Sequence, residues 1–203
     1  MARKSNSDFR RAGIVRALQT VMAKQGYEKA TIQAIAAEAG LAPGLLHYHF
    51  KKKQDILVSL VTTLADYGQQ RFAELAGAAE DPGARLRAYI EARLGLGPGA
   101  SQEIVAAWVM IAAEAVRQPE VREAFQRAVV VELDLLTGLL ADCLREQGRQ
   151  EAEARKLAAG VLALMEGAYQ LACAAGEVMP TGYAAEAAMR YAVLGIEASA
   201  LSG

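Results

Sequence analysis

The sequence predicts an all-α protein, and three features support this class. Hydrophobic residues make up 53% of the 203 residues and alanine is abundant, whereas clusters of β-branched residues between turn signals are scarce. Apolar residues recur at helical spacing along most of the chain, which indicates helices with one buried face. Glycine, proline and short polar runs divide this pattern into nine segments. We therefore expect about nine helices around a substantial core.

The first predicted helix begins at Ser7 or Asp8, either of which can cap it, and ends at Gly26. Residues 3–8 form a charged arm at its start, for which contact with DNA and exposure to solvent are equally good interpretations. The helix carries one apolar stripe, which consists of Ile14, Leu18, Val21 and Met22. This stripe provides a packing surface for the short helices that follow.

The stretch 31–50, TIQAIAAEAGLAPGLLHYHF, predicts two short helices joined by a tight turn. Thr31 is a good N-cap for the first helix, and Gly40 suits the left-handed residue that ends it. Pro43 fits the first turn of the second helix, where its missing N–H is no loss. Leu46 and Phe50 share one face of that helix, so the more polar side chains lie on the other sides. This is a helix-turn-helix pattern, in which the second helix enters the major groove of DNA.

Six further helices are expected, over residues 53–75, 82–94, 101–117, 119–148, 151–175 and 181–199. Turn-forming residues separate them, including a clear break at 96–100 with Gly97-Pro98-Gly99. The last two helices are apolar on nearly every side and must therefore be covered on every side. Helices of the same chain could cover them, or the last two helices of two chains could close a four-helix bundle.

Charge is distributed unevenly along the chain. Residues 1–55 carry ten basic and four acidic side chains, a net charge of +6, whereas the remainder carries 12 basic and 19 acidic side chains, a net charge of −7. The overall charge of −1 hides this division. A basic amino-terminal part is expected where one end of a chain meets phosphate groups and the other does not.

The stretch 31–50 resembles the helix-turn-helix of the TetR family of bacterial transcriptional repressors. Many fixed spacings agree with the family pattern, and the match covers about the first quarter of the chain. The residues that carry it are Thr31, Ile35-Ala36, Ala39-Gly40-Leu41, Gly44, Leu46, Tyr48, His49-Phe50 and Lys53. The resemblance implies a helix-turn-helix DNA-binding domain over 1–53 and an effector-binding and dimerisation domain over 54–203.

The resemblance further implies a cytoplasmic homodimer that represses transcription and leaves a palindromic operator when a small molecule binds. Residues 151–175 and 181–199 are then the expected dimer interface. Two alternatives stay open at this point. One is a helical enzyme with an accessory helix-turn-helix-like unit, although no catalytic or phosphate-binding motif is present. The other is a DNA-binding protein that responds to no ligand.

The family pattern assigns the DNA contacts to ten positions. Gln33, which can pair with adenine, and Leu45, which can contact a thymine methyl, are expected to meet bases together with Pro43, Gly44 and His47. Thr31, Tyr48, His49 and Lys53 match positions that hold the phosphate backbone, although Tyr48 could instead pack on the next helix. Ala42 stands where a hydroxyl residue commonly caps the recognition helix and binds phosphate, so that contact is in doubt.

Large side chains on the later helices could line an apolar effector pocket, although plain core is the favoured interpretation for each of them. These residues are Tyr67, Tyr89, Trp108, Met110, Phe125, Met165, Glu166 and Tyr169. Glu166 is a charge within an apolar run, where it could pair with a cationic ligand, an arginine or a polar group across a dimer interface. The run 108–125 with Met165-Glu166-Gly167 resembles the choline-sensing branch of the family, but this does not identify the effector.

Several site types are not expected. Cys143 and Cys173 have no metal-ligand spacing and are interpreted as free thiols, and His47 and His49 diverge at i, i+2 on a helix. We therefore predict no metal site and no cofactor. Glu166 and Gln170 interrupt the most apolar run, 157–176, so no membrane span is expected.

Overall fold

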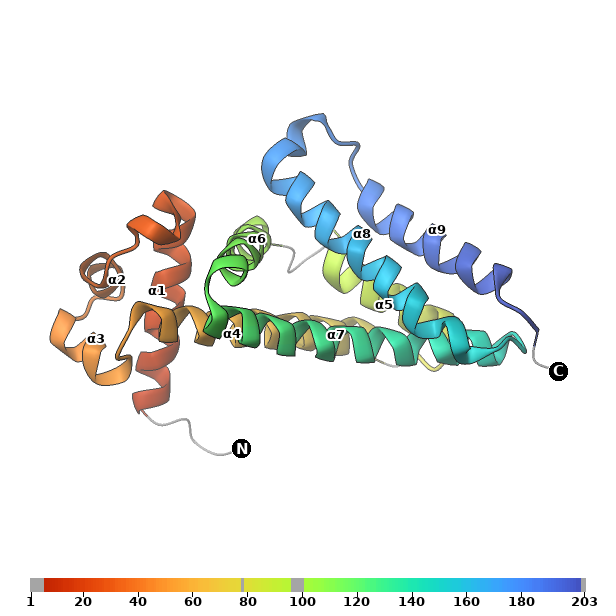
Figure 1. The fold of residues 1–203 in the computed structure, drawn as a ribbon, viewed down its shortest axis with the longest axis horizontal. Coiled ribbons are helices and arrows are strands. Elements are labelled where there is room, and N and C mark those ends of the chain that lie inside the picture. Colours follow the sequence, from red (N-terminus) through yellow and green to blue (C-terminus); the bar gives the residue numbers. More distant parts are fainter. Residues whose placement is uncertain (1–5, 78, 96–100, 202–203) are drawn as a thin grey trace. The chain divides into compact units, whose positions relative to one another are not determined.

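The computed structural model describes residues 6–77, 79–95 and 101–201, which form nine α-helices and no strand (Figure 1). The predicted all-α class is confirmed, and most helix ends lie within a few residues of the predicted ones. The helices are α1 (Asn6–Lys29), α2 (Ile32–Glu38), α3 (Pro43–His49), α4 (Lys53–Ala76), α5 (Pro82–Leu94), α6 (Gln102–Arg117), α7 (Pro119–Glu146), α8 (Ala154–Ala175) and α9 (Tyr183–Ala198). The predicted break at 96–100 and the arm up to residue 5 lie outside the described residues.

The first helix differs from the prediction at its C-terminal end. Gly26 does have a left-handed φ of 80°, as a terminating glycine should, but the chain resumes a further helical turn to Lys29. With a ψ of 163°, Gly26 lies in a region that only glycine adopts readily. The extra turn places Tyr27 in a buried position, and the Tyr27 carbonyl accepts from the backbone N–H of Ala30 at 3.1 Å.

The described chain divides into two compact units that differ from the predicted domain boundary at 53/54. Unit one comprises 1–65 and 103–126, and unit two comprises 66–102 and 127–203. Both α4 and α7 therefore contribute residues to each unit. In unit one, α1, α2 and α3 pack on one another around the fully buried side chains of Ile14, Leu18, Ile35, Leu46 and Leu57. The boundary between the functional domains stays a prediction.

In unit two, α5, α8 and α9 pack together, and α8 and α9 lie side by side (Figure 1). The core of this unit contains Tyr89, Leu136, Leu140, Val161 and Ile196, all of which are buried. Glycine permits the close approach of α8 and α9, because a Cβ atom at Gly160 would overlap the hydroxyl of Tyr191. A backbone hydrogen bond also joins the segment before α8 to the segment after α9, since the N–H of Gln150 donates to the Ala200 carbonyl at 2.9 Å.

One segment has the length and composition of a membrane span, which the sequence did not lead us to expect. The most apolar 18-residue window within Glu151–Val178 has a mean hydropathy of 1.4, and only 22% of that window is buried within the chain. Helices in the cores of soluble proteins meet the same criterion, but they are mostly buried. Among the residues that the structure describes, the apolar face of α8 is therefore largely uncovered.

Candidate DNA-binding surface and buried effector-domain cluster

The turn between α2 and α3 has the geometry that the sequence predicts. Thr31 caps α2, since its Oγ1 accepts from the backbone N–H of Ala34 at 3.1 Å. Gly40 has a φ of 65°, and the backbone N–H of Leu41 returns to the Ala36 carbonyl at 2.9 Å. Ala42 occupies the N-cap position of α3 with extended backbone angles and makes no side-chain capping bond. Thr31 therefore caps α2 as predicted, whereas α3 begins without a side-chain cap.

Burial separates an inner and an outer face of this motif. Ile35 and Leu46 have no exposed surface, which fixes α2 and α3 against α1. The predicted base-contacting residues are all exposed, and they are Gln33, Pro43, Gly44, Leu45 and His47. Thr31 and Ala42 are also exposed, and the side chain of Tyr48 is 81% exposed. Their positions are therefore free to meet a nucleic acid, although their contacts with DNA stay a prediction.

Two predicted phosphate-binding residues have partners within the protein. His49 is partly buried, its ring lies edge-on to Tyr48 at 5.2 Å, and its carbonyl accepts from Arg11. The Lys53 ammonium donates to the Tyr27 carbonyl at 2.7 Å and lies 4.0 Å from the centre of the Tyr27 ring. Burial lowers the pKa of Lys53, while Glu114 and Glu28 act against this. In this arrangement Lys53 joins α4 to the end of α1.

The uncapped start of α3 gives a direct prediction for stability. Replacing Ala42 by serine should stabilise the protein by about 0.5–1 kcal/mol, because the extended backbone at this position suits a capping hydroxyl. Urea unfolding measures the change. Thr31→Ala is the matched control and should cost about 1 kcal/mol, since it removes the cap of α2. A serine variant no more stable than the natural protein would contradict this account.

Within unit one, the junction of α6 and α7 holds the end of α1 and the start of α4 through polar side chains. Glu114 is 7% exposed and accepts from Arg117 and Gln118, both at 2.6 Å. Arg117 also donates to Glu28 at 3.1 Å. Gln54 of α4 donates to the side chains of Gln118 and Glu120, each at 3.1 Å. We call these six residues the corner network.

The predicted pocket residues are divided between the two units. In unit one, Trp108 and Phe125 stack with ring centres 4.9 Å apart, and Met110 is partly buried. Unit two holds the other five, of which Tyr89 and Met165 are buried and Tyr67, Glu166 and Tyr169 are partly buried. The effector pocket formed by all eight stays a prediction. The structure adds charged neighbours to Tyr89 and Tyr169.

A buried polar cluster in unit two is centred on an ion pair between α5 and α7. The Arg93 guanidinium binds the Glu132 carboxylate through two bonds, of 2.6 and 3.1 Å, and the two side chains are only 8% and 12% exposed. The Tyr89 hydroxyl donates to the same carboxylate at 2.7 Å. The Tyr169 hydroxyl donates to the Arg93 carbonyl at 3.3 Å. Each of these four side chains therefore has a specific partner.

Arg71 lies at the edge of this cluster. Its side chain comes from α4 and donates to the carbonyl groups of Ala92, at 2.9 Å, and Gly95, at 3.4 Å. A Cβ atom at Gly68, one turn earlier on α4, would lie 3.1 Å from the Arg93 guanidinium. The Gly68 carbonyl accepts a hydrogen bond from Arg93. Glycine at 68 thus lets α4 approach the ion pair closely. We call Arg71, Tyr89, Arg93, Glu132 and Tyr169 the arginine cluster.

The raised pKa values of three tyrosines predict how the stability of the protein changes at alkaline pH. Burial raises the pKa of Tyr27 to about 12 and also raises the pKa values of Tyr89 and Tyr169. In the unfolded chain these hydroxyls titrate near pH 10. The free energy of unfolding should therefore be constant with respect to these groups below pH 10 and fall as pH rises above it, because only the unfolded chain then loses the protons. A phenolate absorbance titration should show these three of seven tyrosines ionising only as the protein unfolds. Ionisation of all seven near pH 10 in folded protein would contradict this burial.

Arg71, Arg93 and Glu132 are not among the functional residues that the sequence predicts. A signal was present, because Glu132 lies four and seven positions before the buried Leu136 and Leu139 and thus on an apolar face. Likewise, Arg71 lies seven and eleven positions after the buried Leu64 and Leu60. A charge at such a position indicates a buried partner.

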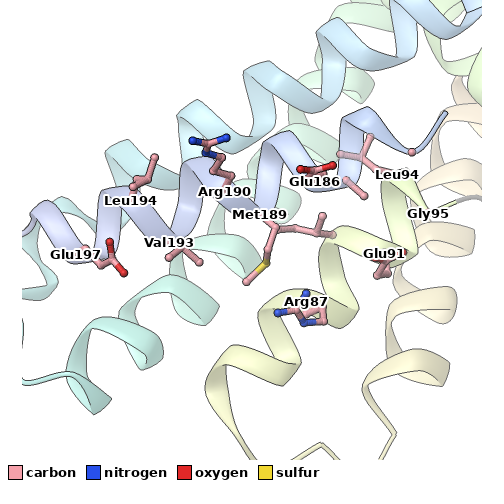
Figure 2. Close-up of a pocket in the computed structure, with 13 residues that line it drawn as sticks. Arg87, Glu91, Leu94, Gly95, Glu186, Met189, Arg190, Val193, Leu194 and Glu197 are labelled. Atoms are coloured by element: carbon pink, nitrogen blue, oxygen red, sulfur yellow. The ribbon is translucent and has the colours of Figure 1, made fainter. Parts of the chain in front are cut away.

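A groove of about 680 Å³ is lined by residues of α5 and α9 within unit two (Figure 2). Met189 reaches from α9 toward α5, and Val193 lies beside it. The charged side chains at its borders have both signs and are Arg87, Glu91, Glu186, Arg190 and Glu197. All five are exposed. The groove lacks the buried polar groups that distinguish the arginine cluster.

Comparison with known proteins identifies the family. A model described as bacterial regulatory proteins of the tetR family matches residues 14–60, and a model described as the C-terminal domain of BetI-type transcriptional repressors matches residues 82–195. The chain belongs to the TetR family. The first match contains the whole α2–α3 motif, and the second contains four of the five members of the arginine cluster.

Relatives of this TetR-family protein are regulators of transcription. The HTH-type transcriptional regulator BetI of Rhizobium meliloti is 31% identical over 165 residues, which cover 79% of this chain and 76% of the relative. BetI of Paraburkholderia phytofirmans is 26% identical and covers 91% of this chain and 92% of the relative. The predicted function as a DNA-binding transcriptional regulator is confirmed, and the enzyme alternative is not favoured.

Solved structures share the fold of this TetR-family chain. A transcriptional regulator from Rhodococcus sp. Rha1 has a TM-score of 0.80 at 23% identity, over 95% of this chain and 99% of the other. A transcriptional regulator from Saccharomonospora viridis, solved in complex with choline, has a TM-score of 0.75 at 21% identity, over 95% and 98% of the two chains. The helix-turn-helix and the C-terminal helical domain thus belong to a common architecture.

Proposed function

We propose that this TetR-family regulator binds a palindromic operator as a cytoplasmic homodimer and represses transcription until a small-molecule effector releases it. The observation that carries the proposal is the exposed outer face of α2 and α3. Gln33 and His47 lie on this face, whereas Ile35 and Leu46 anchor the same two helices in the core. A rigidly held, exposed helix of this kind is what a major groove accepts.

The roles of the outer residues follow from their chemistry. Gln33 offers a paired donor and acceptor for adenine, and Leu45 offers apolar contact for a thymine methyl. Pro43, Gly44 and His47 lie close enough on α3 to take part in base contacts. Thr31, Ala42, Tyr48, His49 and Lys53 are the proposed backbone-contacting set. Lys53 contributes mainly by fixing the start of α4, because its ammonium is bound to Tyr27.

A second copy of the chain is the proposed cover for the exposed faces of α8 and α9. Leu164 and Leu171 of α8 are each 39% exposed, and Tyr191 and Leu194 of α9 are 40% and 54% exposed. These residues extend along both helices, so pairing with the same faces of a partner closes a four-helix bundle. The pairing also supplies the two-fold symmetry of a palindromic operator. It removes the apolar face of α8 from water without a membrane.

The corner network is the proposed route from effector to DNA. Arg117 and Gln118 at the α6–α7 junction hold Glu28 at the end of α1 and Gln54 at the start of α4. A shift of α6 on effector binding would therefore move the helices that carry the DNA-binding motif. The separation of two recognition helices in a dimer then departs from the half-site spacing, and the operator is released.

The test uses the purified full chain and the DNA upstream of its own gene. Footprinting should reveal two protected half-sites about 34 Å apart, and light scattering should give two chains per particle. If six to ten phosphates are contacted, affinity should fall about 10³- to 10⁵-fold between 50 and 200 mM salt. A single chain in solution, or an affinity that does not vary with salt, would overturn the proposal.

A further inference from the structure

The side chain of Arg71 is a buried cation without a carboxylate partner. It is only 8% exposed, and within the described residues no carboxylate oxygen lies within 4.0 Å of its guanidinium nitrogens. Its guanidinium donates to two backbone carbonyls, and its Nε is buried with no acceptor among the residues that the structure describes. Burial of a charge is costly unless the charge is paired and its hydrogen bonds are made.

The nearest acidic group of the cluster cannot neutralise Arg71. Both oxygens of Glu132 are occupied, one by Arg93 and the other by Arg93 and Tyr89. Glu166 is near enough to Tyr169 for its charge to raise the pKa of that hydroxyl, but among the described residues no Glu166 oxygen lies within 4.0 Å of an Arg71 nitrogen. The last carbonyls of α5 provide a partial negative charge of about one half at most. Arg71 therefore retains uncompensated positive charge.

We propose that the effector carries an anionic group, a carboxylate in the first instance, and that the Arg71 guanidinium binds it. This inference rests on the proposed function and gives the effector its chemical class. A planar guanidinium matches a carboxylate with two parallel hydrogen bonds, and such charge-assisted bonds are strong in a site away from water. The unpaired Nε supplies one of the donors.

The same arrangement disfavours a simple organic cation. A carboxylate that binds an ammonium ligand must be free of other cations, but Glu132 is bound to Arg93. An incoming cation would find both oxygens of Glu132 already occupied by Arg93 and Tyr89. The regulator from Saccharomonospora viridis was solved with choline, so our inference separates the ligand preference of this chain from that of a protein with the same fold.

The test measures the melting temperature of the purified chain of 203 residues in the presence of small probes of matched size. Propionate and benzoate are compared with propionamide and benzamide, and choline chloride is the cationic probe, all at constant ionic strength. We expect both carboxylates to raise the melting temperature, whereas the amides and choline leave it unchanged. R71Q should lower the affinity for both carboxylates at least tenfold, so that a tenfold higher concentration is needed for the same rise in melting temperature. R190Q, at an exposed position on α9, should leave this affinity unchanged. An equal response to carboxylates and amides would overturn the inference.

Arg71 also closes the end of α5, so R71Q could lose stability for a purely structural reason. R71K keeps the charge and the long stem but lacks Nε, and it should retain a weakened carboxylate response. Equal carboxylate responses in R71Q, R71K and the natural protein would overturn the role of Arg71. Release of the operator by choline in both R71Q and the natural protein would leave the proposed function intact and refute the anionic effector. Failure to bind any operator would instead refute the proposed function.

Discussion

Replacing Tyr48 by alanine should lower operator affinity at least tenfold and leave the melting temperature within about 2 °C of its original value. The side chain is 81% exposed, so the folded protein loses little packing when it is removed. Its hydroxyl and ring stand at the end of α3, where the proposed phosphate contact would fix the register of the recognition helix. A tenfold loss corresponds to about 1.4 kcal/mol, the size of one good hydrogen bond to a charged group.

The affinity is best measured by fluorescence anisotropy on a labelled operator fragment at a fixed salt concentration, because salt alone changes it strongly. Val116→Ala is the matched control, since Val116 is 74% exposed in unit one but lies on α6. It should change neither affinity nor stability. If Tyr48→Ala binds as tightly as the natural protein, α3 does not meet DNA with this face.

The DNA-binding motif was predictable because its signals are local. Thr31 caps α2, Gly40 takes the left-handed turn and Pro43 opens α3, and each choice depends on residues within one helical turn. The inner and outer faces follow from helical spacing, and the exposure of Gln33 and His47 agrees with it. The contacts of these outer residues with bases stay a prediction, because exposure alone does not select a partner.

The arginine cluster was not predictable in the same way. Arg93 and Glu132 are 39 positions apart, and no local pattern states that α5 and α7 will bring them together. The partner of Lys53 is similarly remote, since Tyr27 lies 26 positions earlier and its orientation depends on the unusual angles of Gly26. Such contacts result from tertiary packing and can be recognised in the sequence only as charges on apolar helix faces.

Replacing Arg93 by methionine should destabilise the protein by about 3–5 kcal/mol, the largest effect expected for a single substitution here. The change removes one partner of a buried ion pair and leaves the Glu132 carboxylate with only the Tyr89 hydroxyl. Urea unfolding at a fixed protein concentration measures the loss, since the stability of the proposed dimer would depend on concentration.

Two further variants separate the buried charge from loss of packing. Arg93→Met combined with Glu132→Leu should cost clearly less than the sum of the two single changes, because no unpaired charge remains. Arg155→Met is the control, since its 2.7 Å pair with Asp134 is 58% exposed on each side and should contribute less than about 1 kcal/mol. Additive losses in the double variant would show that the two side chains act independently.

The two separate stretches of unit one have a consequence for synthesis of the protein. The first 65 residues leave the ribosome well before residues 103–126, which carry the corner network partners of Glu28 and Gln54. A growing chain can form the α1–α3 core first, because domains fold as their residues become available. Attachment of the α6–α7 junction must follow later. A nascent chain therefore presents its recognition helix before the parts that regulate it have been made.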